Sequence, residues 1–344
     1  MYSPIRFASD AIRRVVTRKQ RGNVILMYHR INRTDIDPWG LCVDPANFSA
    51  QMKVLGGLAV PVSLEQLPLM RTDHPSVAIT FDDGYVDNLE HAVSALEQHA
   101  IPATLFVSTG YIGSSNGYWW DQLQEIFLSP RVLPSDDLSL FLGGQTYRWV
   151  ISPADLEYSA ENCSAHRGWI AWKDAPPTSR HAVFHQVWSL LRELDTKQRD
   201  DKLDTIRRWA GVPEGRSSAR CMSADELREI GRGPLVRIGS HTVTHSRLSR
   251  LTEAGEWKEL TDSKATLEDI LKQPVETFSY PFGDQSDYSY RTVAAVQKAG
   301  YRLACSNFVG AVGPRSDRFQ LPRLHVLNWN ASDFAAWLRS HLAS

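Results

Sequence analysis

Short runs of consecutive apolar residues alternate along this chain with longer segments in which apolar residues recur at helical spacing. Three runs in the first third predict strands, at Val24-Ile-Leu-Met-Tyr28, Val77-Ala-Ile-Thr-Phe81 and 101–107. Strands that are apolar on both faces are typical of a parallel sheet covered by helices. Helices are predicted between them at 47–55 and up to about His99, the second one capped by Asp87 or Asn88.

The same order of strand, loop and helix returns near the C-terminus. Strands are predicted at 235–239, 277–280, 303–306 and 323–327, and helices at 254–272, 289–298 and 333–342. This alternation predicts an α/β fold with a mainly parallel sheet or barrel.

Residues 113–222 interrupt this alternation. They contain a hairpin-like piece around 138–150 and helical segments near 156–163 and 181–209. No linker-like composition borders the segment, so we interpret it as one long, mainly helical insertion in a barrel loop.

The first 22 residues form a separate basic segment. Arginine and lysine side chains lie between apolar residues at helical spacing, so residues 1–21 are either a membrane-surface amphipathic helix or a solvated helix packed on the domain. A secretory signal needs an apolar stretch of roughly 7–15 residues, which is missing. We therefore expect a cytoplasmic protein, with or without peripheral contact to the inner membrane surface.

Composition excludes several classes of function. The formal net charge is −1 and charged residues make up 22%, so no basic footprint predicts nucleic-acid binding. No apolar run approaches the roughly 20 residues needed to span a bilayer. The four cysteines, Cys42, Cys163, Cys221 and Cys305, form no CxxC pair and predict neither a disulfide framework nor a zinc finger.

Four residues with metal-site chemistry directly follow predicted strands. Asp82 and Asp83 end one apolar run, and His241 and His245 follow another. The loops after parallel barrel strands share one rim, so we expect these side chains to converge. They supply an oxygen ligand, two imidazoles and a spare carboxylate. Three protein ligands leave a coordination position open, as in catalytic zinc sites.

The segments Thr80-Phe-Asp-Asp-Gly84 and Ser240-His-Thr-Val-Thr-His245 resemble the first two motifs of the polysaccharide deacetylase family, also called NodB-homology deacetylases. The resemblance runs in patches from about Asn23 to Trp329, excluding the insertion. It implies that residues 23–344 form a distorted (β/α) barrel of about seven or eight strands. It also implies an enzyme that removes acetyl groups from N-acetylated sugars.

The resemblance implies that Asp83, His241 and His245 bind a divalent metal and that Asp82 is the general base. Zn²⁺ is the expected ion, with Co²⁺, Ni²⁺ or Mn²⁺ as alternatives. Metal ligation would fix the charge of one carboxylate while its neighbour stays free to titrate. Water activated by the metal would then attack the acetamide carbonyl.

The tripeptide Tyr280-Pro281-Phe282 resembles the third motif, in which the residue after proline offers its backbone N–H to the oxyanion. Family members often have an arginine two residues before this proline, where this chain has Ser279. Either Asp82 is tuned differently or another cation substitutes, and Arg323 is the candidate.

His325 resembles the last motif, a histidine on the final strand, and is expected to protonate the leaving amine. A pKa near neutrality suits an imidazole for this task. The alternative is a structural histidine at a strand end. His29, after the first strand, is expected at the same rim, with either a structural role or a contact to substrate. The family's fourth motif is not recognisable near 303–318.

Trp119 and Trp120 begin the insertion and form either a platform for sugar rings or a hydrophobic anchor. A lid-like insertion favours a short or lipid-linked acetamido sugar as substrate. Two other functions stay open: hydrolysis of another amide or a cyclic imide on the same scaffold, and carbohydrate binding without catalysis.

Overall fold

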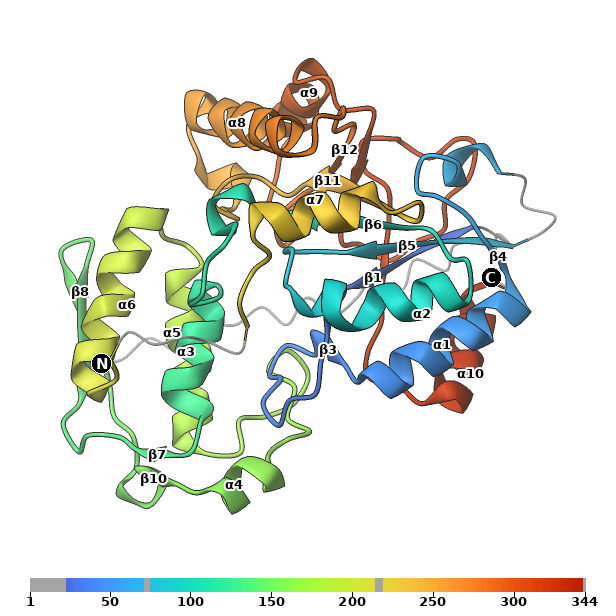
Figure 1. Ribbon diagram of the computed structural model, residues 1–344. Coiled ribbons are helices and arrows are strands. Elements are labelled where there is room, and N and C mark those ends of the chain that lie inside the picture. Colours follow the sequence, from blue (N-terminus) through green and yellow to red (C-terminus); the bar gives the residue numbers. More distant parts are fainter. Residues whose placement is uncertain (1–22, 71–74, 214–218, 343–344) are drawn as a thin grey trace.

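The computed structural model describes residues 23–70, 75–213 and 219–342. Its central sheet has eight parallel strands, seven of them in the spatial order β13-β12-β11-β6-β5-β1-β14, with β4 added to β5. Strands β1, β4, β5, β6, β11 and β12 of this sheet are labelled in Figure 1. The strands are β1 (Val24–Tyr28), β4 (Val60–Pro61), β5 (Ser76–Phe81), β6 (Ala103–Val107), β11 (Val236–Ser240), β12 (Thr277–Ser279), β13 (Leu303–Cys305) and β14 (Leu324–His325). The sheet order follows the chain order except that β14 returns to β1, as in a barrel.

Irregular chain closes the remaining side of the sheet, between β13 and β14. The N–H of Leu321 donates to the carbonyl of Ala304 (2.9 Å), and the N–H of Ser306 donates to the carbonyl of Leu321 (2.9 Å). The N–H of Ala304 in turn donates to the carbonyl of Arg318 (2.8 Å). The predicted distorted (β/α) barrel is therefore confirmed.

Helices cover the outside of the barrel, close to the predicted spans. They are α1 (Pro45–Leu58), α2 (Val93–Gln98), α7 (Ala224–Arg232), α8 (Glu253–Leu271), α9 (Tyr290–Lys298) and α10 (Ala331–Leu342). Short helical turns are η1 (Leu67–Leu69), η2 (Asn88–Ala92), η3 (Thr109–Tyr111) and η5 (Leu248–Arg250). The sequence did not predict α7 or the small pair β2 (Arg30–Ile31) and β3 (Cys42–Val43). None of the described helices is long and apolar enough to cross a membrane.

The predicted capping role of Asp87 or Asn88 is wrong, because both side chains hold the first strand's loop instead. Asp87 accepts from Arg30 Nε (2.9 Å) and from the Ile31 N–H (3.1 Å). Asn88 Nδ2 donates to the carbonyl of His29 (3.0 Å). The helical segment after the Asp82–Gly84 loop begins as the π-helical turn η2.

Every second side chain of β5 points into the barrel, and these side chains change from apolar to polar towards the carboxyl end of the strand. Ala78 packs inside the barrel with Ile25 and Phe106. Two and four residues further on the same face come Thr80 and Asp82, both buried. Gly239 leaves room for Phe106, since a Cβ there would lie 2.5 Å from the Phe106 ring. The interior thus becomes hydrophilic at the carboxyl ends of the strands.

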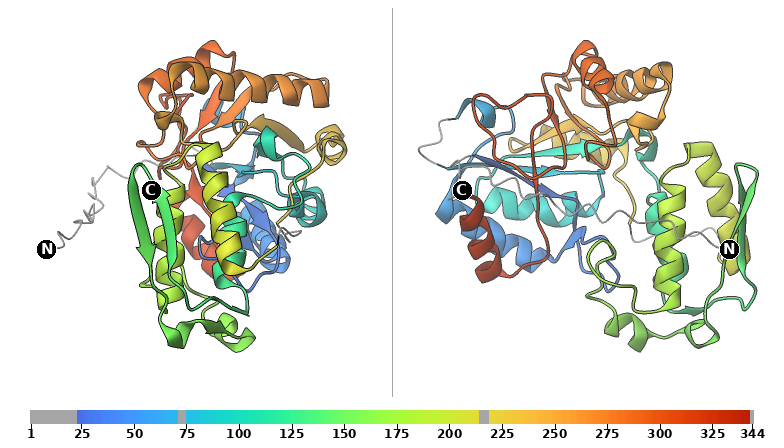
Figure 2. Two further views of the ribbon diagram at one scale, coloured as in Figure 1. Left: turned by 90° about the vertical axis from the view of Figure 1, so that its left-hand side faces the viewer. Right: turned by 180° about the vertical axis from the view of Figure 1, so that it is seen from behind.

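The insertion lies to one side of the barrel and has its own core (Figures 1 and 2). It contains α3 (Trp119–Leu128), β7 (Arg131–Val132), the hairpin β8 (Leu138–Leu142) and β9 (Gln145–Trp149), η4 (Pro153–Asp155), β10 (Glu157–Tyr158), α4 (Ala160–Ala165), α5 (Ser179–Leu191) and α6 (Thr196–Ala210). Its ends meet: the Gly113 N–H donates to the Met222 carbonyl (2.8 Å), and the Cys221 N–H donates to the Ser114 carbonyl (3.0 Å). The predicted N-terminal helix, residues 1–22, lies outside the described residues.

Candidate active site

The backbone is strained where the predicted chemistry lies. Asp83, Thr242, His245 and Phe282 have φ of 76°, 69°, 52° and 60°, whereas non-glycine residues normally avoid positive φ. Such conformations cost about 1–3 kcal/mol each and persist where surrounding contacts hold them. One such contact comes from the insertion, since the Tyr118 hydroxyl donates to the Asp83 carbonyl (2.6 Å).

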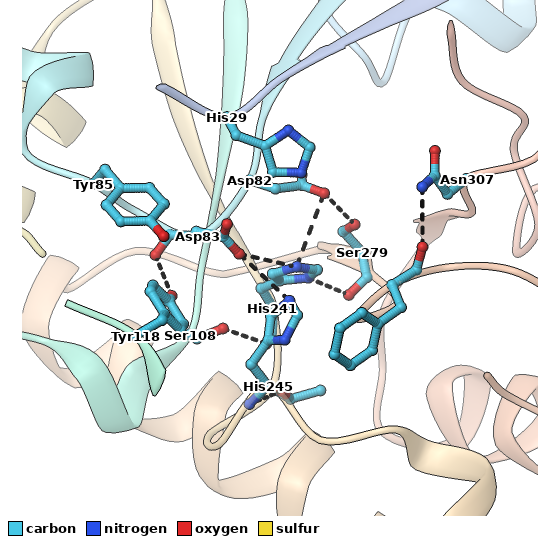
Figure 3. Close-up of polar contacts among 12 residues, drawn as sticks. His29, Asp82, Asp83, Tyr85, Ser108, Tyr118, His241, His245, Ser279 and Asn307 are labelled. Atoms are coloured by element: carbon cyan, nitrogen blue, oxygen red, sulfur yellow. Dashed lines mark hydrogen bonds and ion pairs between the residues drawn. The ribbon is translucent and has the colours of Figure 1, made fainter. Parts of the chain in front are cut away.

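Asp83, His241 and His245 converge as the sequence predicts (Figure 3). Asp83 Oδ1 lies 3.4 Å from His245 Nε2 and 3.6 Å from His241 Nε2, and all three side chains are at least 94% buried. Asp83 Oδ1 has no hydrogen-bond partner among the described residues. A buried carboxylate oxygen between two imidazole nitrogens is a donor set that fits a divalent cation.

The two histidines are in the protonation state that a cation requires, whereas the ionised form of Asp83 needs a cation to stabilise it. Burial, followed by the charge of Asp82, raises the pKa of Asp83 well above its usual range. Burial lowers the pKa of both His241 and His245, so both rings are neutral at neutral pH. His241 Nδ1 donates to the Ser279 carbonyl (2.7 Å), which leaves Nε2 as the lone-pair nitrogen that faces Asp83.

The histidine loop is held by α8. Glu259 accepts hydrogen bonds from the N–H groups of Val243 (2.8 Å) and Thr244 (2.9 Å). The Ser108 hydroxyl, at the end of β6, donates to the His241 carbonyl (2.8 Å). These contacts fix the positions of the two imidazoles before any ligand binds.

Arg323 contacts Asp82, as expected from the sequence. Its two terminal nitrogens donate to the two carboxylate oxygens at 2.7 Å each. Burial alone would raise the pKa of Asp82, but Arg323 outweighs burial, and the pKa lies below its usual range. Ser279 Oγ donates to Asp82 (3.3 Å) and accepts from Arg323 (2.9 Å). Asp82 is therefore an ionised carboxylate beside the cluster of Asp83, His241 and His245, which could hold a cation.

His29 and His325 lie together on the other side of Asp82. Their ring centroids are 5.5 Å apart, and His29 Nδ1 and His325 Nε2 have no hydrogen-bond partner among the described residues. The premise of a neutral-range pKa for His325 is wrong: burial lowers it to about 4. Burial also lowers the pKa of His29 to about 3. Both rings are neutral at pH 7.

Pro281, Phe282 and Gly283 form a tight turn at the rim. The Gly283 N–H donates to the Pro281 carbonyl (2.7 Å), so the positive φ of Phe282 lies at the centre of a γ-turn. The Phe282 ring lies 4.8 Å from that of His245, and no acceptor contacts its N–H in the described part of the chain. Tyr280, by contrast, stacks on Tyr288 (4.0 Å) inside the barrel wall. Its side chain does not reach the site.

Trp119 and Trp120 are 2% and 5% exposed, which contradicts a sugar platform and fits an anchor. Trp120 Nε1 donates to the Tyr85 hydroxyl (2.9 Å), and its ring stacks on Tyr118 at 4.3 Å. It also packs edge-on against His245 at 4.7 Å. Trp120 therefore joins the insertion to the cluster of Asp83, His241 and His245.

Known proteins share these motifs and this fold. The family model for polysaccharide deacetylase matches residues 70–132 and 204–304. The "Putative polysaccharide deacetylase YxkH" of Bacillus subtilis (strain 168) is 28% identical over 120 residues, which are 35% of this chain and 42% of that protein. The chain thus matches less than half of its curated relative.

Two solved structures show the same fold at low identity. The Streptococcus pyogenes deacetylase PplD, in complex with acetate, is 16% identical with a TM-score of 0.55, covering 92% of this chain and 97% of its own. IcaB from Ammonifex degensii is 16% identical with a TM-score of 0.54, covering 93% and 97%. The resemblance of this sequence to polysaccharide deacetylases is therefore confirmed by the family model, and the barrel fold by the two solved structures.

Sequence reasoning missed several residues of the site. Glu259 lies on a helix face and gave no signal. Trp39, Trp188 and Arg192 line the seam between the barrel and the insertion, where the ring centroids of Trp39 and Trp188 are 4.1 Å apart and the rings are tilted. None of the three belongs to a recognisable motif. A tryptophan such as Trp188, in a helical segment, is as typical of an apolar core as of an active site.

Proposed function

We propose that this protein is a divalent-metal-dependent hydrolase that removes the acetyl group from an N-acetylated sugar. One observation carries the proposal: the unpaired, buried Asp83 Oδ1 faces the Nε2 atoms of His241 and His245, beside the ionised Asp82. The names of the related proteins support an acetylated saccharide as the substrate class. The acetate in the PplD structure is the product that such a reaction releases.

Asp83, His241 and His245 would hold the ion, most simply Zn²⁺, with Co²⁺, Ni²⁺ or Mn²⁺ as alternatives. When bound, the ion supplies Lewis-acid chemistry: it makes a water molecule more acidic and polarises a carbonyl oxygen. Asp82 takes the proton of the water that attacks the acetamide carbonyl, and Arg323 keeps Asp82 ionised for this purpose.

The Phe282 N–H is proposed to donate to the carbonyl oxygen as negative charge develops on it, because it is a backbone donor at the rim without another partner in the described chain. His325 is assigned to the leaving nitrogen. Since its ring is neutral at pH 7, it must first take up a proton, such as the one that Asp82 accepts from the attacking water, and then pass it to the nitrogen as the carbon–nitrogen bond breaks. The products are acetate and a free amino sugar.

The length of the sugar substrate and the cellular location of the protein remain predictions. The insertion packs against the ligand cluster through Tyr118 and Trp120, which favours a short or lipid-linked sugar over a long polymer. Residence in the cytoplasm, with or without contact of residues 1–21 to the inner membrane surface, also stays a prediction.

The proposal is tested by measuring acetate release from a panel of nucleotide-linked, lipid-linked and oligomeric acetamido sugars. Protein depleted of metal and reloaded with Zn²⁺ or Co²⁺ is compared with depleted protein and with loaded Asp82→Asn. We expect acetate only from the loaded wild type. Equal turnover after metal depletion contradicts the proposal, and so does cleavage confined to cyclic imides or amides without a sugar. Sugar binding without acetate release identifies a binding protein instead.

A further inference from the structure

The side chain of Phe282 contacts the insertion as well as the barrel. The Arg192 guanidinium lies 4.6 Å from the centre of its ring, and the Trp188 ring approaches it edge-on at 6.4 Å. On another side lies the proposed metal ligand His245, at 4.8 Å. Phe282, on the barrel rim, thus lies between His245 on one side and two residues of the insertion on the other. Those two residues stand more than eighty positions earlier in the chain.

Trp188 and Arg192 form a single surface at the end of α5. They are four residues apart, so they lie on the same face of the helix, and the guanidinium also lies 5.7 Å from the Trp188 ring. Asp287, whose side chain is fully buried, fixes Arg192 through an ion pair of 2.7 Å. Asp287 also accepts from the Asp284 N–H (3.1 Å), so it belongs to the loop that continues from Phe282.

The turn at Phe282 needs such support. A γ-turn with positive φ at a phenylalanine is rare and strained, and it persists where its surroundings hold it. From the barrel side, Asn307 Nδ2 donates to the Phe282 carbonyl (3.0 Å) and the Asn307 N–H donates to the Gly283 carbonyl (2.9 Å). From the other side, the ring contacts of Arg192 and Trp188 restrain the side chain.

We propose that the insertion is a working part of the active site, in which Arg192 and Trp188 are positioning residues that hold the Phe282 turn in its reactive conformation. They touch neither the ligand cluster nor the nucleophile, and act through the Phe282 ring. This inference rests on the proposed function, because the turn is assigned there as a donor to the carbonyl oxygen. It gives the insertion a role beyond covering the site.

A double-mutant cycle tests the inference: wild type, Arg192→Ala, Phe282→Ala and the double variant, each loaded with metal. Phe282→Ala keeps the backbone N–H and removes the ring. We expect Arg192→Ala to lower kcat on the order of tenfold to a hundredfold with little change in KM or metal content, as a misplaced group does. In the Phe282→Ala background the same substitution has little further effect, because the contact is already lost.

Two further variants separate positioning from plain stabilisation. Arg192→Lys keeps a cation and is expected to restore part of kcat. Arg250→Ala removes a neighbouring arginine of the same seam, which pairs with Glu193, and is expected to leave kcat unchanged. The unfolding midpoints of the metal-free variants of the cycle show whether the contact between Arg192 and the Phe282 ring contributes to stability, independently of activity.

Three outcomes would overturn the inference while leaving the proposed function intact, and a fourth would remove both. Additive effects of the two substitutions on kcat, or an Arg192→Ala variant with normal kcat, overturn the inference and leave the proposed function intact. The same holds if the unfolding midpoints are coupled but kcat is not, since the contact is then structural alone. A metal-loaded wild type that releases no acetate removes the proposed function and this inference together.

Discussion

Arg323 and Asp82, 241 positions apart in the chain, are joined by two hydrogen bonds of 2.7 Å inside the barrel. The guanidinium comes from the segment before β14, whereas the family's arginine would have stood at Ser279, at the end of β12. The small serine leaves room for the longer side chain and donates to Asp82 itself. Asp82 is therefore paired with an arginine from the segment before β14 instead of one at the end of β12.

Replacing Arg323 with Ala should cost stability and activity together. Breaking a buried ion pair costs about 3–5 kcal/mol, because the remaining charge is left buried without a partner. The folded-state pKa of Asp82 lies below its unfolded value. Its contribution to stability is thus present above the unfolded pKa, near pH 4, and is lost as pH falls through the folded value.

In Arg323→Ala the pKa of Asp82 rises, so the acidic limb of kcat/KM should move to higher pH. Metal content should change far less than activity, since Asp83 and not Asp82 belongs to the ligand cluster. Arg323→Lys is the matched control, with one cation and poorer geometry. Unchanged activity and an unchanged acidic limb would remove Arg323 from the mechanism.

Asp82→Asn should separate the base from the ligands. The amide keeps the size of the carboxylate but accepts no proton, so kcat should fall about 10²–10⁴-fold. Metal content, measured by elemental analysis, should stay close to that of the wild type. Asp83→Asn should show the opposite pattern, with metal lost first. The assignment of the two carboxylates is reversed if Asp82→Asn is the variant that loses metal.

The sequence predicted the ligand set because each ligand directly follows a strand. Asp83 and His241 are fixed by two short motifs, and a parallel barrel brings the ends of β5 and β11 to one rim. Arg323 became the candidate because the resemblance implies an arginine where this chain has Ser279, and Arg323 lies close by in the pattern of motifs. The convergence depended on local patterns and one general rule of topology, whereas the roles of the individual residues came from the family resemblance.

Other parts of the site depend on contacts that leave no periodic signal. Nothing in the segment around Glu259 distinguishes an exposed helix face from one that binds the histidine loop. The environment of His325 was misjudged, because burial, which lowers its pKa to about 4, is a property of the folded rim. Tyr280 follows the right motif, but its side chain points into the barrel wall.

Metal binding should be coupled to deprotonation of Asp83. Burial and the charge of Asp82 raise the pKa of Asp83, and a bound cation favours the ionised carboxylate, so binding of the ion lowers this pKa. His241 and His245 are already neutral and release none. Calorimetry in buffers of different ionisation enthalpy, repeated at successively lower pH, should therefore report proton release on binding. Affinity should weaken as pH falls, and binding without proton release would contradict the role of Asp83.

His325→Gln and His29→Gln compare the two neighbouring rings. If His325 protonates the leaving amine, its substitution lowers kcat about 10²–10⁴-fold while metal content is kept. An aryl acetate has a leaving group that departs without a proton, so His325→Gln should hydrolyse such a substrate at nearly the normal rate. His29→Gln serves as the paired control. A larger loss in His29→Gln than in His325→Gln would transfer the donor role to His29.

Trp120→Phe tests whether the tryptophans anchor the insertion or contact the sugar. The phenyl ring keeps the stacking on Tyr118 but lacks the N–H that donates to the Tyr85 hydroxyl. That hydroxyl donates in turn to Asp121 (2.9 Å), so the substitution interrupts a buried network. We expect a loss of about 1–3 kcal/mol of unfolding free energy, measured by chemical denaturation of the metal-free protein. KM for the sugar should stay the same, because a ring that is 5% exposed offers no face to a ligand. A raised KM with unchanged stability would show that the site opens and that Trp120 meets the substrate.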